Sequence, residues 1–409
     1  MAKLLMSCDD YVYCYKGKYY AGSQDKYEFY QRYLRVFDEL RLVTRCVMGK
    51  DLNRSRVELS DRRIEYIPVP FFSGPKQYAK QYFKIGRLLR SITNGCDAAI
   101  LRLPSTIGQR VCGKVMKAGI PYATEIVYDA KDGFENGTKL VNKLLWCIIH
   151  HQMQTSCTTA RGVSCVTEHY LQQHYFSMLP NAFTSHYSSL ALPKEFYTAP
   201  RKYPHKDIFT IAHVSNQVQF NGRKGFNEII RAIKILKDRN VYVQLNFIGP
   251  DYQDGTALLS DFARSLGVED RIHFMGWASR QQLSDYLDSS DLYVMPTTSE
   301  GLPRVIIEAM AKGLPCITTP VSGNPELITG HFLVDYNDIS TLADRIEELK
   351  NDKKLYELTS SDNFSRSLQY EESILEKRRD EFYTQLKNCI KDSKEGRQSV
   401  KSYTRRIPM

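Results

Sequence analysis

Residues Asp291–Glu326 read DLYVMPTTSEGLPRVIIEAMAKGLPCITTPVSGNPE, and this stretch decides the fold class. Leu292–Met295 is a short apolar run that predicts a buried strand. Arg304–Lys312 has the apolar spacing of a helix, and a second buried strand is expected at Cys316–Thr318. A strand, loop, helix and strand of these lengths form a βαβ crossover, so the sheet is predicted to be parallel.

The loop Pro296–Pro303 follows a predicted strand and leads into a helix, which is where open α/β sheets bind ligands. We expect the N–H groups of Leu302, Arg304 and Val305 to face an anion there. The first amides of a helix have no partner within it, and the helix dipole favours negative charge at this end. The loop therefore predicts an anion site.

Two carboxylates flank this predicted site, Glu300 before the helix and Glu308 a turn inside it. An anion site between two carboxylates suits a ligand with phosphate in its middle and hydroxyl-rich sugars on both sides, as in a nucleotide-sugar. The alternative is an ordinary βα crossover whose acids are solvated charges near a helix start.

The wider motif is Glu300-x7-Glu308, then Ala309-Met310-Ala311-x-Gly313-x-Pro315 and later Glu326. It resembles the retaining glycosyltransferases of family 4, which have the GT-B fold. The resemblance implies an α/β protein of two doubly wound Rossmann-like domains whose parallel sheets face a central cleft. It also implies that Glu300 contacts the donor sugar and that Glu308 contacts the ribose hydroxyls, while Gly301 belongs to the Gly301–Val305 helix start on which we place the donor diphosphate.

A second motif, Asn221–Gly225, precedes a predicted helix at Phe226–Asp238. A lysine in such a strand-to-helix loop can reach a phosphate. By the resemblance, Lys224 binds the donor diphosphate. The family often has an arginine earlier in this loop, where this chain has Ser215 and Asn216, so Arg223 is the candidate for the second cation. The alternative is a solvated basic helix start.

Two further strand ends are expected to line the donor site. Met275 and Trp277 follow a predicted strand where the family packs the nucleotide base, and Trp277 either covers the base or caps the domain core. Gly249 ends another strand and either lines the site or makes a plain turn.

The first domain offers weaker signals. Gly17 and Gly22 follow the first predicted strand, where the family has a glycine loop near the sugar and phosphate. Arg102 and Glu125 end strands that face the expected cleft, as does Asp129. We take Arg102 and Glu125 as candidate catalytic residues beside Glu300 and Lys224, because the histidine that many family members carry in these regions is missing. Ordinary polar residues at strand ends are the alternative.

Composition agrees with two folded domains. The 409 residues exceed one hydrophobic core, and 42% hydrophobic with 11% aromatic residues excludes disorder. The ten cysteines have no C-x-x-C pair or metal-like spacing and predict buried thiols in a reducing compartment. The N-terminal residues have no signal-peptide core, and no run of about 18 apolar residues predicts a membrane span. A cytoplasmic location is expected.

The pattern of strands and helices predicts five segments: a first α/β domain at residues 1–190, a linker at 191–206, a second α/β domain at 207–367, a helix at 368–390, and a basic disordered tail at 391–409. The family resemblance implies that the first domain binds the acceptor, that the second binds the nucleotide-sugar, and that the helix returns to the first domain. A last strand of the second domain is expected at Phe332–Val334, and an early helix of the first domain at Tyr27–Arg41.

The net positive charge comes from the first half of the chain, where residues 1–200 hold 27 Lys and Arg but 17 Asp and Glu. This excess predicts an anionic partner there. Pro75–Ile92 reads as an amphipathic helix with a cationic stripe of Lys80, Lys84 and Arg87, which can lie on an anionic bilayer. A helix packed on its sheet with a wet outer face is the alternative, and both can hold together.

We predict a retaining glycosyltransferase that moves a sugar from a nucleoside diphosphate, UDP rather than GDP, to a glycan or polyprenyl-linked acceptor of a cell-surface polymer. No nucleic acid, metal or cofactor is expected, since no Asp-x-Asp has a metal-site context and Lys224 with helix amides can replace a divalent ion. A GT-B epimerase and a non-catalytic nucleotide-sugar binder are the alternatives. Peripheral contact with the inner face of the plasma membrane is possible for such a protein.

Overall fold

The computed structural model describes residues 1–49, 56–131, 140–190, 192–205 and 208–404. The chain divides into two compact units. Unit 1 comprises residues 1–131, 141–187 and 377–409, and unit 2 is centred on Ser188–Glu376. The sequence analysis drew the boundary at residue 190.

Unit 1 is built on a nine-stranded sheet in the described part of the chain. Its strands are β1 (Lys3–Tyr15), β2 (Lys18–Ala21), β3 (Glu39–Met48), β4 (Val57–Glu58), β5 (Ile64–Pro70), β6 (Ala98–Leu103), β7 (Tyr122–Ile126), β8 (Gly162–Cys165) and β9 (Phe183–His186). The parallel strands follow the order β5-β3-β1-β6-β7-β8-β9, so the order reverses between β1 and β6.

The first strand is longer than the sequence predicted. Its pairing with β3 shifts register between Ser7 and Tyr11, and beyond this bulge it continues to Tyr15 and forms an antiparallel hairpin with β2. Lys16 and Gly17 make the turn with positive φ angles of 47° and 77°, as a tight hairpin requires. The expected glycine loop at Gly17 is therefore corrected: this glycine closes a hairpin.

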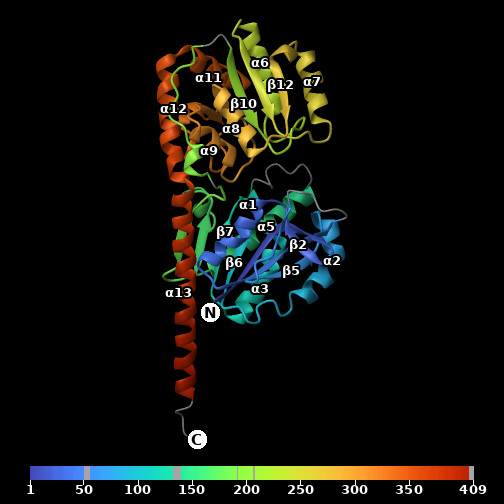
Figure 1. Cartoon of the computed structure of the whole chain (residues 1–409), viewed down its shortest axis with the longest axis vertical. Coiled ribbons are helices and arrows are strands. Elements are labelled where there is room, and N and C mark those ends of the chain that lie inside the picture. Colours follow the sequence, from blue (N-terminus) through green and yellow to red (C-terminus); the bar gives the residue numbers. More distant parts are fainter. Residues whose placement is uncertain (50–55, 132–139, 191, 206–207, 405–409) are drawn as a thin grey trace. The chain divides into compact units, whose positions relative to one another are not determined.

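Helices connect these strands (Figure 1). They are α1 (Gln24–Gln31), the 3-10 turns η1 (Arg32–Arg35) and η2 (Leu171–Gln173), α2 (Gly74–Leu88), α3 (Thr106–Ala118) and α5 (Leu140–Thr158). The helix expected at Tyr27–Arg41 was too long, because the chain has already entered β3 at Glu39. On α2, Ile85 is fully buried and Lys80, Lys84 and Arg87 are exposed, so the predicted core face and wet face are both present.

The last helix, α13 (Glu372–Thr404), belongs to unit 1 from Lys377 onward. Phe382 and Tyr383 on this helix are buried, and Asp380 pairs with Arg35 at 2.9 Å. The prediction ended the helix at residue 390 and expected a disordered tail; up to Thr404 that expectation was wrong. The polar segment holds good helix formers and no proline before Pro408.

Unit 2 is a five-stranded parallel sheet in the described part of the chain. Its strands are β10 (Phe209–Val214), β11 (Val243–Ile248), β12 (Ile272–Gly276), β13 (Leu292–Met295) and β14 (Cys316–Thr318). The order β12-β11-β10-β13-β14 reverses between β10 and β13. The predicted βαβ crossover from β13 to β14 is confirmed. Doubly wound sheets bind their ligands where the strand order reverses, which here is between β10 and β13.

The helices of unit 2 surround this sheet (Figure 1). They are α6 (Phe226–Asp238), α7 (Gly255–Ser265), α8 (Arg280–Ser289), α9 (Arg304–Ala311), α10 (Asn324–Leu327), α11 (Ile339–Asn351) and α12 (Lys353–Ser367), with 3-10 turns η3 (Lys194–Phe196), η4 (Glu269–Arg271), η5 (Gly330–Phe332) and η6 (Leu368–Tyr370). The strand expected at Phe332–Val334 is replaced by η5 and one bridge from Leu333 to Thr318.

The segment expected as a linker packs against unit 2. The Arg201 guanidinium donates hydrogen bonds of 2.8 Å to the carbonyl oxygens of Leu287 and Lys312. These bonds satisfy carbonyl groups at the ends of α8 and α9, which have no partner inside their helices. The polar composition of this segment suggested a free linker, but its Arg201 side chain caps the ends of two helices.

Candidate active site

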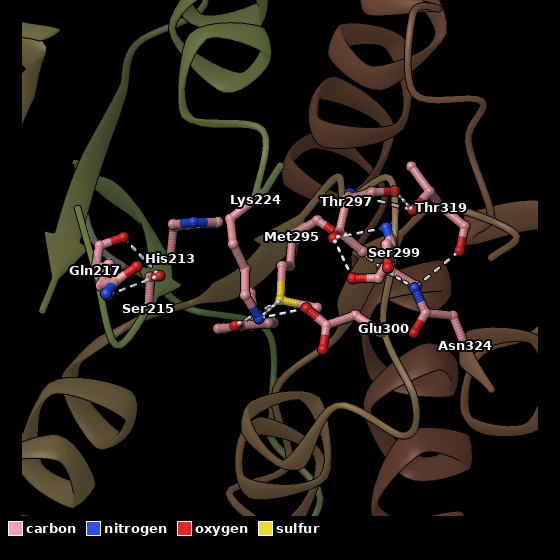
Figure 2. A network of polar contacts seen from close by, with 12 residues as sticks. His213, Ser215, Gln217, Lys224, Met295, Thr297, Ser299, Glu300, Thr319 and Asn324 are labelled. Atoms are coloured by element: carbon pink, nitrogen blue, oxygen red, sulfur yellow. Dashed lines mark hydrogen bonds and ion pairs between the residues drawn. The ribbon is translucent and has the colours of Figure 1, made fainter. Parts of the chain in front are cut away.

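The site in unit 2 is centred on an ion pair between two loops. Lys224 precedes α6 in the loop after β10, and Glu300 lies in the loop between β13 and α9. Their side chains meet through Lys224 Nζ and Glu300 Oε1, and both are mostly buried, with 16% and 12% exposed. Figure 2 shows the two side chains pointing toward each other beside Met295. Because β10 and β13 flank the reversal of strand order, the pair lies at the expected ligand position.

Gly225 explains why these two loops come so close. It has a φ of 70°, and a Cβ there would overlap the carbonyl oxygen of Pro296. The Thr298 N–H also donates to the Arg223 carbonyl oxygen at 3.0 Å. Glycine after Lys224 is therefore required by the packing of one loop on the other, and this packing places Lys224 against Glu300.

Hydrogen bonds to residues that follow β14 hold the Glu300 loop in place. Thr297 N–H donates to Thr319 Oγ1 at 3.1 Å, and the Thr319 hydroxyl donates to the Thr297 carbonyl at 2.5 Å. Asn324 Nδ2 donates to Thr318 Oγ1 at 2.9 Å and to the Thr319 carbonyl at 3.0 Å. These contacts, visible on the right of Figure 2, fix the loop before any ligand arrives, which is the preorganisation that a binding site needs.

The start of α9 lies next to this ion pair and is uncapped. Pro303 takes the N-cap position and makes no side-chain hydrogen bond to the helix. The amides of Arg304 and Val305 are therefore first-turn donors without an intrahelical partner. Gly301 is fixed through its carbonyl, which accepts from the Gly323 N–H at 3.0 Å, and Leu302 is buried beside it. The start of α9 thus has first-turn N–H groups without a side-chain cap, and the predicted anion contact stays a prediction.

His213 is a supporting residue that the sequence analysis missed. The backbone pairing of β10 with β13 ends at Ala212 and Tyr293. One residue further along, the His213 side chain links the two strands, because its Nδ1 lies 2.8 Å from the Val294 carbonyl oxygen. The ring lies edge-on against Phe226 with centroids 4.5 Å apart. Burial lowers the pKa of His213 to about 3, so the ring is neutral near pH 7 and donates from Nδ1.

Glu308 lies on α9 and is half-buried. Burial raises the pKa of its carboxyl to about 7, while the nearby Arg304 and Arg280 act in the opposite direction. Among the described residues no hydrogen bond to the Glu308 carboxyl is found, so its assignment to the ribose hydroxyls stays a prediction that the geometry allows.

The remaining predicted donor residues lie at neighbouring strand ends of unit 2. Met275 is in β12, and Trp277 follows it with 69% of its surface exposed, which excludes the alternative that it caps the core. Gly249 follows β11, where a Cβ would overlap the Ser215 carbonyl oxygen. Arg223 is exposed.

No cation replaces the family's first loop arginine directly after β10. Ser215 is buried and its hydroxyl donates to the Gln217 carbonyl at 2.8 Å, and Asn216 is exposed. Arg223, exposed in the Lys224 loop, stays the candidate for the second cation of the predicted diphosphate site.

The structure corrects the assignment of Glu125. Its carboxylate is buried and surrounded by hydrogen-bond donors and cations: Arg32, Tyr33, Arg102, Tyr187 and Tyr383. Burial disfavours its charge, but Arg32 and Arg102 outweigh this and hold the pKa of Glu125 below its usual value. With its oxygens occupied by hydrogen bonds inside unit 1, Glu125 accepts from Tyr383 of α13 at 2.7 Å and has a structural role.

Arg102 shares this structural role. Its Nη1 lies 3.1 Å from Glu125, and its guanidinium stacks 4.9 Å from the centroid of Phe29. We therefore remove Arg102 with Glu125 from the candidate catalytic residues. Their positions at adjacent strand ends were predicted correctly, but the single sequence could not show that they pair with each other.

The start of α3 in unit 1 is occupied by a carboxylate of the chain itself. Asp9, in the bulge of β1, accepts from the amides of Thr106 at 2.8 Å and Ile107 at 3.2 Å, and from the Ser105 hydroxyl at 2.8 Å. Ser105 Oγ in turn caps the Gly108 amide at 2.7 Å. Gly22 lies apart from this position, before the short helix α1.

The described residues contain neither a candidate metal site nor a candidate membrane-spanning helix. No group of three or more His, Cys, Asp or Glu side chains among them could hold a metal ion. None of the helices in the described ranges is long and apolar enough to span a bilayer.

A family model agrees with the donor loops and with the fold. Residues 210–363, which include Lys224, Glu300 and Glu308, match the model of glycosyl transferases group 1. The chain therefore contains a domain similar to the glycosyl transferases group 1 at residues 210–363. The match covers most of unit 2, and the family resemblance drawn from the Glu300–Glu308 motif is confirmed.

Relatives and solved structures extend over more of the chain. It is 24% identical to CapJ of Staphylococcus aureus over 83% of this chain and 84% of that one. It is 32% identical to the UDP-Gal:alpha-D-GlcNAc-diphosphoundecaprenol alpha-1,3-galactosyltransferase of Escherichia coli, over 23% of this chain and 25% of the enzyme. HepE of Anabaena, solved in complex with UDP, aligns with a TM-score of 0.64 at 15% identity over 93% and 99% of the two chains. The fold is GT-B. Another relative, CapM of Staphylococcus aureus, is named as a capsular polysaccharide biosynthesis glycosyltransferase and is 32% identical over 37% of this chain and 39% of that one.

Proposed function

We propose that this glycosyltransferase uses a nucleoside diphosphate sugar, transfers the sugar with retention of anomeric configuration, and needs no metal. The observation that carries the proposal is the juxtaposition of Lys224, Glu300 and the uncapped start of α9 where the strand order of unit 2 reverses. A lysine and free helix amides neutralise a diphosphate without a divalent ion.

The ion pair suits a step in which negative charge develops on the leaving diphosphate. The Lys224 ammonium has three donors, so it can keep Glu300 as one partner while it binds a phosphate oxygen. The α9 amides supply further donors, and both groups stand in place before the charge appears. Glu300 is left with oxygens that accept hydroxyl groups of the sugar.

Retention follows from the family resemblance. The acceptor hydroxyl attacks the anomeric carbon on the face that the diphosphate leaves, and the departing phosphate takes the hydroxyl proton. The carbon–oxygen bond to the diphosphate breaks as the new glycosidic bond forms. No side chain in the donor site is assigned as a nucleophile.

The donor is proposed to be a UDP-sugar, with Glu308 on the ribose and Trp277 beside the base. Support comes from HepE, solved with UDP, and from the E. coli relative, whose name gives UDP-galactose as donor. That relative's name also gives a diphosphoundecaprenol acceptor, so we propose a polyprenyl-linked or other glycan acceptor that binds unit 1, in the synthesis of a cell-surface polysaccharide.

Such an acceptor resides at a membrane, and one surface of unit 1 is suited to it. Helices α2 and α3 contain no acidic residue, and Lys80, Lys84 and Arg87 are exposed on α2. Phe83 stands among them with 85% of its surface exposed. Cations near anionic lipid contribute about 1 kcal/mol each, and an aromatic ring can enter the interface. We propose peripheral contact with the inner face of the plasma membrane from the cytoplasm, where the chain's free thiols stay reduced.

Liposome flotation tests this contact. The wild type should float with anionic vesicles and detach as salt rises, and a Lys80→Glu/Lys84→Glu/Arg87→Glu variant should stay in the soluble fraction. If the wild type ignores anionic vesicles, or if the variant floats with them equally well, the contact on α2 is excluded. Loss of flotation only on deleting residues 391–409 would assign the contact to the C-terminal segment.

The catalytic proposal is tested by incubating the chain with a panel of UDP-sugars and GDP-sugars in excess EDTA. We expect one UDP-sugar to raise the melting temperature of the protein and to be turned over. NMR of the product should show that the anomeric linkage keeps the axial configuration that it has in the donor. Activity that requires added Mg²⁺ or Mn²⁺ would contradict metal independence. Conversion of the donor sugar into its epimer without an acceptor would contradict the transfer itself.

A further inference from the structure

A buried polar cluster in unit 1 has no role in the donor site. Asp129 follows β7, His150 lies on α5, and His174 and Tyr175 follow η2. These elements come together at the carboxyl end of β7 in the parallel sheet. Ligands of doubly wound sheets bind at this edge. Two histidines from distant parts of the sequence thus reach a strand end where the sequence alone showed none.

Tyr175 organises one half of the cluster. Its hydroxyl donates to Asp129 Oδ1 at 2.7 Å and accepts from the Ala130 N–H at 3.3 Å. His150 Nδ1 lies 2.9 Å from the same hydroxyl. Because the hydroxyl proton is directed to Asp129, the hydrogen of this contact belongs to His150 Nδ1. Burial lowers the pKa of His150, so the neutral ring carries a lone pair on Nε2.

His174 occupies the other half. Asp129 is fully buried, and its Oδ2 accepts no hydrogen bond from any residue in the described ranges. His174 Nδ1 lies 3.6 Å from this oxygen and likewise has no hydrogen-bond partner in the described chain. An unpaired buried carboxylate oxygen is costly. The tautomer with its hydrogen on His174 Nδ1, turned toward Asp129, satisfies both atoms and leaves Nε2 free for an outside partner, and 24% of the His174 side chain is exposed.

We propose that this cluster is a sugar-binding site of unit 1, in which His150 and His174 accept hydrogen bonds from hydroxyl groups of the acceptor. Asp129 and Tyr175 are positioning residues that set the tautomer and orientation of both rings. Imidazole nitrogens that accept hydrogen bonds beside the buried Asp129 carboxylate select hydroxyl donors and disfavour phosphate. The proposal rests on the glycosyltransferase activity proposed above and names the side chains that its acceptor would meet.

Ligand-observed NMR tests the site without knowledge of the natural acceptor. The probes are the methyl glycosides of glucose, galactose and N-acetylglucosamine, added to the full chain saturated with UDP. At least one glycoside should bind the wild type, and His174→Ala and His150→Ala should each weaken that affinity at least tenfold. His151→Ala is the matched control, since His151 is an exposed neighbour on α5 outside the cluster, and it should bind as the wild type does.

Two further measurements separate this site from the fold and from the donor site. His174→Gln retains a polar group near the position of Nε2 and should recover part of the lost affinity, and UDP affinity by calorimetry should be equal in all variants. The proposal is overturned if no glycoside binds the wild type, or if the alanine variants bind as the wild type does. It is also overturned if they lose UDP and glycoside affinity together. Failure of the wild type to bind UDP would instead count against the proposed donor site.

Discussion

Unit 1 and unit 2 both start a helix where their strand order reverses, but they treat that helix start in opposite ways. In unit 2, α9 begins at Pro303 without a side-chain cap, beside Lys224 and Glu300. In unit 1, the first amides of α3 are occupied by Asp9 and Ser105. The same topology therefore leaves one helix start without a side-chain cap, as the proposed anion site requires, and fills the other with the chain's own side chains. Whether a switch point binds phosphate depends on which side chains the chain itself places there.

The comparison predicts its largest effect at Lys224. Lys224→Ala removes the cation from the proposed anion site and should lower kcat/KM for the donor about 100-fold, since a hydrogen bond to a charged group contributes about 1.5–3 kcal/mol and more charge develops during transfer. Steady-state kinetics with the active UDP-sugar measure it. Arg223→Ala, which changes the adjacent exposed cation, is the matched control, and a larger loss there would shift the diphosphate contact to Arg223.

The filled helix start makes the opposite prediction for Asp9. Asp9→Ala removes hydrogen bonds to the start of α3 and should lower the free energy of unfolding by about 2 kcal/mol. UDP affinity should not change, because the cap acts only within unit 1. Urea denaturation and calorimetry report the two quantities. A variant of wild-type stability that loses UDP would reverse the assignment of the two sites.

Glu308→Gln sharpens the comparison through pH. The folded carboxyl has its pKa raised from 4.5 to about 7, so folding opposes its ionisation and the wild type loses stability as pH rises from about 4.5 to 7. The variant should match the wild type near pH 4 and be more stable by about 3 kcal/mol at pH 8. Its UDP affinity at pH 8 should fall about tenfold, because the ribose loses a charged acceptor. Equal stability of the two proteins at pH 8 would show that Glu308 is not desolvated.

The smallest effect is expected at His213. His213→Phe keeps an aromatic ring against Phe226 but removes the donor to the Val294 carbonyl, and should lower kcat/KM about fivefold with a stability loss of about 1 kcal/mol. His213→Asn restores a donor near Nδ1 and should recover part of the activity at lower stability. If the phenylalanine variant is fully active, the bridge between β10 and β13 does not position the ion pair.

The sequence predicted unit 2 well because its signals are local. The strand, loop and helix around Glu300 lie within 36 consecutive residues, Asp291–Glu326, and Lys224 is identified by the adjacent Gly225. Only the structure gives the reason for that glycine, which is the close approach of Pro296 from a distant loop. Periodicity defines the elements, but it does not report which loops touch.

Unit 1 was predicted less well because its key contacts join residues far apart in the sequence. Glu125 bonds to Tyr383, 258 residues away, and no local pattern reveals that such a carboxylate is already satisfied. The histidines near Asp129 come from α5 and from the segment after β8, so a search of the strand ends could not find them. The hairpin of β1 and β2 was missed because Lys16–Gly17 lacks the usual turn dipeptide.

Hydrogen–deuterium exchange of the full chain with and without UDP tests the central claim most directly, because it reports both helix starts in one experiment. UDP should slow exchange in the peptides that contain Lys224–Phe226 and Gly301–Ile306 of unit 2. Exchange at Thr106–Gly108 of unit 1 should not change, since those amides are already bonded to Asp9 and Ser105. Protection at Thr106–Gly108 with no change at Gly301–Ile306 would contradict the assignment of the two helix starts.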